Sequence, residues 1–179
     1  TAMAAGAPMC DYQGMVAEPG AVFDAKDLAR ALGVHRFDFG HMLASQAAFA
    51  PYSKGEASAW VVDVSAGHAP YAAGRREAGV GIIKDLEKKK RKIERELGPI
   101  VFTALSTCQD AFDRLFALKR AQLRATGQTD VFAAGWPMRL AETLFASQDG
   151  DFGGAQFTLH VDGKLAATQF HLRGARTVH

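Results

Sequence analysis

Two histidines in the last third of the chain are the side chains best suited to acid–base chemistry. Histidine can accept or donate a proton near neutral pH, because its ordinary pKa lies there. His160 and His171 stand on either side of an Asp-Gly dipeptide at residues 162–163. A two-residue turn of this type predicts a β-hairpin made of residues 155–161 and 164–173. The pattern therefore places both imidazoles on one hairpin.

The register of this hairpin decides what each histidine faces. If Val161 pairs with Lys164, one face is apolar and the other polar, because successive side chains of a strand point to opposite faces. The apolar face would hold Phe157, Leu159, Ala166, Thr168, Phe170 and Leu172. The polar face would hold Gln156, Thr158, His160, Ala167, Gln169 and His171. We expect the apolar face to pack on the core, and the polar face either to meet solvent or to line a site.

The sequence lacks the motifs of several other chemistries. It contains no His-Glu-x-x-His motif and no His/Cys pair at zinc spacing, so no metal site is expected. It contains no Walker motif and no Gly-x-Ser-x-Gly elbow. Cys10 and Cys108 have neither metal nor redox spacing, which fits a reducing compartment and predicts a cytoplasmic protein. No apolar run of about 18 residues exists, so no membrane span is expected.

A long charged helix is predicted at residues 70–97, ahead of the hairpin. Gly98 and Pro99 end it, because glycine accepts the left-handed cap conformation and proline cannot continue the hydrogen-bond ladder. Interior glycines destabilise a helix by about 1 kcal/mol each, so we expect it to be continuous or broken once near residues 79–81. Its apolar stripe consists of Ile83, Leu86, Ile93 and Leu97. The stripe is interrupted at Lys90, so part of the helix should stay in solvent.

The basic run at residues 88–92 of this helix has two interpretations. It could follow the phosphates of a nucleic acid. Glu87, Glu94 and Glu96 interleave with the cations, however, and the run contains no aromatic residue able to stack on bases. The net charge of the whole chain is only +2. We therefore expect a solvated face and no nucleic-acid partner, and keep nucleic-acid binding as the weaker alternative.

The order of the predicted elements indicates the fold class. A strand at residues 60–65 precedes the charged helix, and a strand at residues 100–105 follows it. Next come a helix over residues 112–126, a helix that begins at Trp136, and the hairpin. A hairpin makes a sheet at least partly antiparallel. The prediction is an α/β (α+β) fold with a mixed, largely antiparallel sheet and flanking helices.

Four stretches together carry a family resemblance. Residues 91–98 read Arg-Lys-Ile-Glu-Arg-Glu-Leu-Gly and lead into Ile-Val-Phe-Thr at residues 100–103. Leu-Lys-Arg at residues 118–120 follows, and residues 157–170 read Phe-Thr-Leu-His-Val-Asp-Gly-Lys-Leu-Ala-Ala-Thr-Gln-Phe. These stretches resemble the GNAT-type acetyltransferase-like proteins associated with bacterial cellulose and exopolysaccharide biosynthesis. Such proteins are relatives of the Fem-type peptidyltransferases, in which two GNAT-like halves sit in tandem.

This resemblance implies a domain organisation. Residues 1–69 would be the end of a first GNAT-like half, residues 70–98 a charged connecting helix, and residues 99–179 the start of a second half. In GNAT proteins a glycine-rich loop between a strand and a helix holds the acyl-CoA pyrophosphate through backbone N–H groups. No such loop occurs before His179. We therefore expect a GNAT-like fold that is incomplete at its C-terminal end, and a fragment that is inactive by itself.

The resemblance also implies a function for the full-length protein. It would be an N-acyltransferase that moves an acyl group from acetyl-CoA or another acyl-CoA to an amine or sugar acceptor in polysaccharide biosynthesis. The acceptor would attack the thioester directly, helped by orientation and by a proton acceptor. The main alternative is a non-catalytic, partner-binding module of GNAT-like fold that uses the charged helix. The open edge of an interrupted sheet also predicts self-association.

Site residues follow from the hairpin register under this interpretation. His171 would be the catalytic acid–base residue, and Gln169 would contact the substrate on the same polar face. Lys119 and Arg124, from the preceding helix, would bind substrate near the rim of the acceptor cleft. No residue is assigned to a cofactor, and no cofactor is expected on these residues alone.

Overall fold

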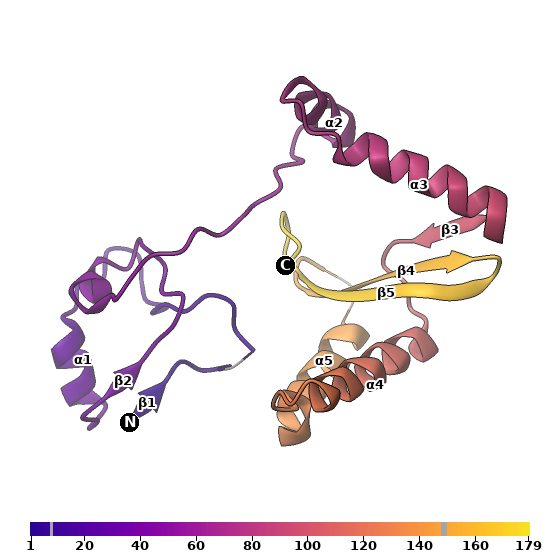
Figure 1. Cartoon of the computed structure of the whole chain (residues 1–179). Helices are drawn as coiled ribbons and strands as arrows, with labels where there is room; N and C mark the ends of the chain where they lie inside the picture. Colours follow the sequence, from indigo (N-terminus) through magenta and orange to yellow (C-terminus); the bar gives the residue numbers. More distant parts are fainter. Residues whose placement is uncertain (8, 148–149) are drawn as a thin grey trace. The chain divides into compact units, whose positions relative to one another are not determined.

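The chain divides into two units, Thr1–Val61 and Val62–His179 (Figure 1). The computed structural model describes residues 1–7, 9–147 and 150–179, so that Pro8, Gln148 and Asp149 lie outside the description. The two units are described separately below. No helix of the described residues is both long enough and apolar enough to cross a bilayer.

The first unit is built around a cluster of phenylalanine rings. Its elements are β1 (Ala2–Met3), α1 (Ala25–Ala31), β2 (Phe37–Asp38) and the 3₁₀ helix η1 (Ala47–Tyr52), and β1 pairs with β2 in parallel. Phe49 is buried, and the rings around it, with centroids 5.4–6.1 Å away, belong to Phe23, Phe37 and Phe39. Asp24 caps α1 by accepting hydrogen bonds from the first N–H groups of the helix. Aromatic packing thus stabilises a unit that has little regular structure.

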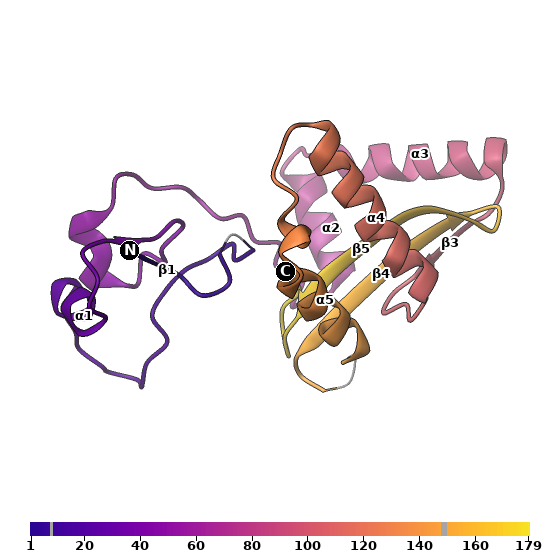
Figure 2. The same cartoon turned by 90° about the horizontal axis from the view of Figure 1, so that it is seen from below.

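The second unit is a three-stranded antiparallel sheet with helices beside it. Its helices are α2 (His68–Glu77), α3 (Ile82–Leu97), α4 (Gln109–Ala125), η2 (Val131–Ala134) and α5 (Trp136–Ala146). Its strands are β3 (Ile100–Thr103), β4 (Gly153–Val161) and β5 (Lys164–Arg173), in the order β3-β4-β5. Figure 2 shows α4 and α5 lying across one face of the sheet. The prediction of a mixed fold with an antiparallel sheet and flanking helices is confirmed.

The predicted long helix is broken once, between α2 and α3. Gly79 lies in the break with a φ of +74°, a conformation that glycine adopts without strain. The side chains at residues 88–92 are all exposed, as the pattern of charges predicted. At the other end of α3, Asp162 of the hairpin turn donates its backbone N–H to the carbonyl oxygen of Pro99, at 3.0 Å. The end of α3 is therefore tied to the tip of the hairpin.

The predicted strand at residues 60–65 is wrong. The segment is irregular, and Trp60 and Val61 are 94% and 84% exposed. Its β-branched residues favour an extended backbone, but a strand also needs a neighbour to pair its N–H and C=O groups. Among the described residues none pairs with this segment.

Phenylalanine rings also form the core of the second unit. Phe112 and Phe116 of α4 are buried, and their rings lie 4.7 Å apart. Phe145 of α5 stacks on Phe112 at 4.4 Å. Phe170 of β5 meets Phe112 edge-on at 5.4 Å, so the strand contributes to the same cluster as the helices. The side of the hairpin that carries Phe170 is therefore the side that α4 and α5 cover.

A β-bulge corrects the predicted faces of the hairpin. Val161 pairs with Lys164 as predicted, but His160 pairs with Leu165 and Leu159 with Ala167, so Ala166 is an extra residue. Beyond this point the two strands are offset by one residue from the predicted register. The covered side holds Gln156, Thr158, His160, Thr168, Phe170 and Leu172, and the opposite side holds Ala155, Phe157, Leu159, Ala167, Gln169 and His171. Each strand alternates as predicted, but the assignment of Phe157 and Leu159 to the core was wrong.

The offset buries two polar residues. Gln156 is 0% exposed and Thr158 is 2% exposed, because their side of β4 faces the helices. Gln156 donates its Nε2 to the carbonyl oxygen of Cys108, at 2.9 Å, and accepts a bond of 2.7 Å from the Ser106 N–H at its own carbonyl. These bonds attach the middle of β4 to the loop that precedes α4. A buried glutamine thus acts as a connector between sheet and helix.

The outer edge of β3 is unpaired among the described residues, and we therefore predict that the chain associates with itself. β3 pairs only with β4 among the described residues, and Phe102 is 62% exposed. An uncovered apolar edge strand is a template for pairing with another chain. We expect sedimentation velocity to show a dimer that grows with concentration and that Phe102→Lys abolishes. Phe152→Lys, at a position 63% exposed and outside β3, should leave the dimer intact. A wild-type chain that stays monomeric at high concentration would contradict this.

Gly154 provides a test of the packing between β4 and the helices. A Cβ at this position would lie 2.6 Å from Cζ of Phe170 and 2.7 Å from the carbonyl oxygen of Leu144. Because one of these atoms belongs to the backbone, we expect Gly154→Ala to lower the free energy of unfolding by about 1–3 kcal/mol. Gly74→Ala is the control, since it lies inside α2 with no atom within 4 Å of the new Cβ. Chemical denaturation should show no loss for the control; equal losses in both variants would refute tight packing at Gly154.

Candidate functional site

The side of the hairpin opposite to α4 and α5 carries the candidate site. We call it the outer face, and it comprises Phe102, Ala155, Phe157, Leu159, Ala167, Gln169 and His171. Ala155 is buried at one end of this face, whereas Ala167 and Gln169 are exposed. Phe102 and Phe157 stack nearly parallel with centroids 6.0 Å apart. The rings of Phe157 and His171 meet edge-to-face with centroids 5.5 Å apart. An aromatic platform therefore lies directly beside the predicted acid–base residue.

Both ring nitrogens of His171 have partners. Nδ1 lies 3.1 Å from the backbone carbonyl oxygen of His179, and Nε2 lies 3.2 Å from Oε1 of Gln169. Both partner atoms are oxygens that accept, so the neutral ring can donate to only one of them. In the tautomer with the proton on Nδ1, Nδ1 donates to His179 and Nε2 holds the lone pair, and the amide group of Gln169 turned by 180° donates to Nε2. In that tautomer Nε2 is the basic atom of His171.

Gln169 and His171 are brought together as the sequence predicted. They are two residues apart on β5, so both point to the outer face, and they contact each other through the bond at Nε2. His171 is half-buried and Gln169 is exposed. A small molecule could therefore reach the pair from solvent.

Lys119 and Arg124 do not join this pair. Both lie on α4, which packs against the Phe170 side of the sheet, whereas Gln169 and His171 point away from it. Lys119 donates to Oε1 of Gln122 at 3.3 Å, and Arg124 lies 3.5 Å from Oδ2 of Asp130. The expected position at the rim of one shared cleft is therefore wrong, because α4 covers the Phe170 side of the sheet and its side chains lie across the sheet from Gln169 and His171.

The position of Arg124 is explained by its contact with the carboxylate of Asp130. Its carboxylate accepts a bond of 2.9 Å from Nε of Arg120 and caps η2 through a bond of 3.2 Å from the Phe132 N–H. Its side chain is 11% exposed, whereas that of Arg124 is 61% exposed. Arg124 therefore lies at the periphery of a contact between α4 and η2.

The other histidine of the hairpin lies on the opposite side. His160 alternates with Leu159 along β4 and shares its side of the sheet with Gln156 and Thr158. The prediction that His160 and His171 share a face is therefore wrong, again because Ala166 is inserted between the matched positions. Only one imidazole of the hairpin is available to the outer face.

The groups with a displaced pKa are not members of the outer face. The backbone N–H of Ser65 donates to Asp63 at 2.9 Å and lowers the pKa of that carboxyl. Arg36 donates to Asp38 at 2.7 Å, which raises the pKa of the guanidinium. Both shifts favour the charged form of a surface group. They indicate local ion pairing and capping, which are structural roles.

The described residues do not fit the pyrophosphate of an acyl-CoA. In that part of the chain, no strand runs into a glycine-rich turn that opens a helix: β3 reaches α4 through residues 104–108, which contain no glycine. After β5 the chain turns at Gly174, and His179 pairs back onto Leu172 by two bonds of 2.8 and 2.9 Å. The described residues also contain no group of three metal-ligating side chains. The outer face is thus a candidate for the acceptor and the proton, and no residue is assigned to the CoA.

Sequence reasoning missed Phe102 and Phe157 as members of this face. Both were read as core residues or strand formers, because an apolar side chain on an alternating strand is usually buried. The signal that could have found them is the Ala166-Ala167 pair, since two small residues in a strand can accommodate a bulge. That signal is weak without a structure.

The comparison with known proteins covers the region just described. A family model described as an acetyltransferase (GNAT) domain matches residues 82–179, more than half of the chain. No curated protein and no solved structure matches the chain significantly. The matched residues include α3, the whole sheet and the outer face. Because the match spans more than half of the sequence and agrees with the observed sheet and helices, the chain belongs to the GNAT acetyltransferase family.

Proposed function

We propose that the protein transfers an acyl group from acyl-CoA to an amine or sugar acceptor that binds at the outer face of the hairpin. Family membership supports acyl transfer in general, and GNAT domains generally use acyl-CoA as the donor. The observation that carries the acceptor site is the oriented imidazole of His171 beside the Phe102–Phe157 platform. The polysaccharide context of the acceptor rests on the sequence resemblance.

In this proposal His171 is the proton acceptor. Its Nδ1–H bond to the His179 carbonyl leaves Nε2 as the base, and a protonated amine or a hydroxyl placed at Nε2 would lose its proton there. The nucleophile would then attack the acyl carbon, CoA would leave as a thiolate with the electron pair of the carbon–sulfur bond, and the thiolate would take up a proton to become the free thiol. Gln169 contacts Nε2, and the acceptor would displace the Gln169 side chain from this position. A sugar ring could stack on Phe157, whose ring already contacts His171.

The experiment that tests this function measures acyl transfer by the protein expressed from its full reading frame. Labelled acetyl-CoA is offered with a panel of amines, amino sugars and short oligosaccharides, and the acylated product is identified by mass. Transfer to one class of acceptor above the rate of hydrolysis is the expected result. Hydrolysis alone, or no reaction with any acceptor, would refute the proposal.

His171→Ala should lower turnover by roughly 10²–10⁴-fold, the usual effect of losing an acid–base group. The melting temperature should change little, because His171 is only half-buried and on the side of the sheet opposite to α4 and α5. His160→Ala is the matched control, since it removes the same side chain from the other side of the same hairpin. A pH–rate profile that loses its lower limb in His171→Ala would identify the proton acceptor. Equal turnover in both variants would exclude His171 from the chemistry.

The CoA site can be tested separately on residues 1–179. Because the described residues contain no glycine-rich turn between a strand and a helix, we expect no micromolar binding of acetyl-CoA by calorimetry. Heat of binding at micromolar acetyl-CoA would show that another part of these residues holds the cofactor.

A further inference from the structure

The charges of α3 are mixed in the sequence but separated on the helix. At 3.6 residues per turn, successive residues are about 100° apart around the axis. Five cations fall on one sector of about 100°: Lys84, Lys88, Arg91, Lys92 and Arg95. No acidic residue of α3 falls within that sector, and the apolar stripe lies opposite to it. We call these five residues the basic strip.

The acidic residues of α3 form the borders of the basic strip. Asp85 and Glu96 follow one border, and Glu87 and Glu94 follow the other. Cations outside the strip occupy both residues of the second border: Arg76 of α2 lies 3.9 Å from Glu87, and Lys90 lies 3.8 Å from Glu94. Glu87 and Glu94 therefore pair with cations that do not belong to the basic strip.

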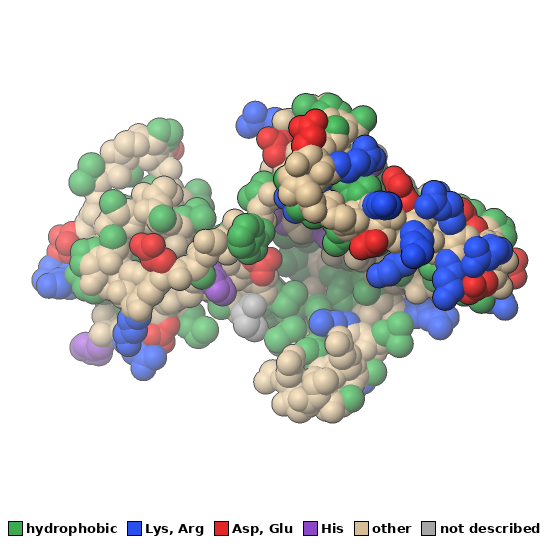
Figure 3. All heavy atoms as spheres, turned by 45° about the horizontal axis from the view of Figure 1, so that its top comes forward, with side chains coloured by type: hydrophobic (Ala, Val, Ile, Leu, Met, Phe, Trp, Pro, Cys, Tyr) green, Lys and Arg blue, Asp and Glu red, His purple; other side chains and the backbone are tan. Residues whose placement is uncertain are grey.

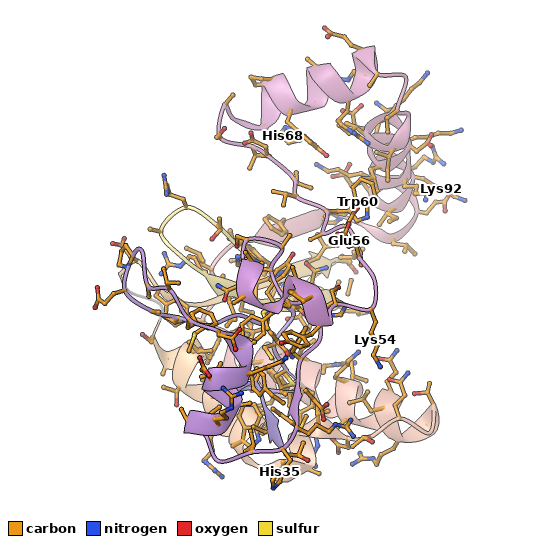
Figure 4. The ribbon with its side chains drawn as sticks, turned by 90° about the vertical axis from the view of Figure 1, so that its left-hand side faces the viewer. His35, Lys54, Glu56, Trp60, His68 and Lys92 are labelled. Carbon is orange, nitrogen blue, oxygen red and sulfur yellow. The ribbon has the colours of Figure 1, made fainter. Side chains whose placement is uncertain are left out.

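Most of the basic strip has no internal partner. Arg95 pairs with Glu96 at 3.1 Å, whereas Lys84, Lys88, Arg91 and Lys92 form no ion pair with any described residue. All five side chains are exposed. Figure 3 shows Lys and Arg side chains gathered over this part of the surface, and Figure 4 shows Lys92 projecting outward from α3. Four of the five cations of the strip are thus without an ion-pair partner among the described residues.

We propose that the basic strip docks an acidic helix of a partner protein. Lys84, Lys88, Arg91 and Arg95 are spaced by four, three and four residues, so they form a straight ladder about 16 Å long. A partner helix with carboxylates at the same spacing presents a ladder of equal pitch and opposite charge. The acidic borders restrict the positively charged surface to the width of one helix. They repel a partner whose negative charges are spread over a wider surface. Charge complementarity of this kind sets the rate and register of association.

Two other polyanions fit the strip less well. A nucleic-acid duplex would bring its phosphates against the four border acids, and α3 carries no aromatic side chain on which a single strand could stack its bases. A helix that lies in a membrane surface buries its apolar stripe in the lipid. On α3 that orientation would turn the basic strip away from the headgroups and place the acids beside them.

The test uses a fluorescein-labelled helical peptide with four Glu residues spaced by four, three and four positions. Fluorescence anisotropy measures its binding to the 179-residue chain at low ionic strength and again at 0.5 M salt. The comparison peptide has the same composition, with the four Glu residues distributed around the helix. We expect the ladder peptide to bind at least about tenfold more tightly than the comparison peptide, and salt to weaken it strongly.

Paired charge reversals identify the strip. K88E/R91E should weaken the ladder peptide by about tenfold or more, because both changes fall inside the strip. K89E/K90E makes the same change in net charge on the same helix but outside the strip, and it should weaken binding by less than about threefold. Circular dichroism of both variants checks that α3 stays helical.

Three results would overturn the proposal. The first is equal loss of binding in the two variants, which would show that only net charge matters. The second is equal affinity for the two peptides. The third is tighter binding to single-stranded DNA or to phosphatidylglycerol vesicles than to the ladder peptide at the same ionic strength, which would assign the strip to one of those polyanions.

Discussion

The packing of Phe170 against α4 and α5 is the contact on which the arrangement of the second unit depends. A strand that places one ring in a core must direct its next side chain to the other face. With Phe170 against Phe112 and Phe145, the neighbours Gln169 and His171 have only the outer face available. The position of the candidate base is therefore a consequence of hydrophobic packing on the far side of the sheet.

The bulge at Ala166 then decides which residues of β4 accompany His171. With a regular hairpin, Gln156 and Thr158 would have lain beside it, and the face would have been polar throughout. The extra residue instead brings Phe157 and Leu159 to the outer face and buries Gln156 in the core. The buried amide donates its Nε2 to the carbonyl oxygen of Cys108, which offsets part of the cost of burying it, whereas its Oε1 has no hydrogen-bond partner among the described residues.

The helix α3 shows how a surface pattern can be hidden in a sequence. Lysine, arginine and glutamate alternate along residues 84–96, which is typical of a solvated helix. Around the helix axis the same residues separate into a strip of cations with acidic borders. The family match begins at Ile82, so this helix and the sheet belong to the same matched region. Docking at the strip and chemistry at the outer face would take place on different surfaces of the second unit.

Much of this architecture was determined by the sequence alone. The alternation of apolar and polar residues and the Asp-Gly turn were sufficient to predict the hairpin. Gly98 and Pro99 predicted the end of α3 at Leu97, and the glycines near residue 80 predicted the single break. These are local effects, which depend on neighbouring residues only. The strand predicted at residues 60–65 failed because strand formation needs a partner that local sequence does not supply. Tertiary structure also decided the faces of the hairpin: Phe170 packs with α4 as predicted, but the register shift at Ala166 places Gln156 and Thr158 on its side of the sheet and moves Phe157 and Leu159 to the opposite side.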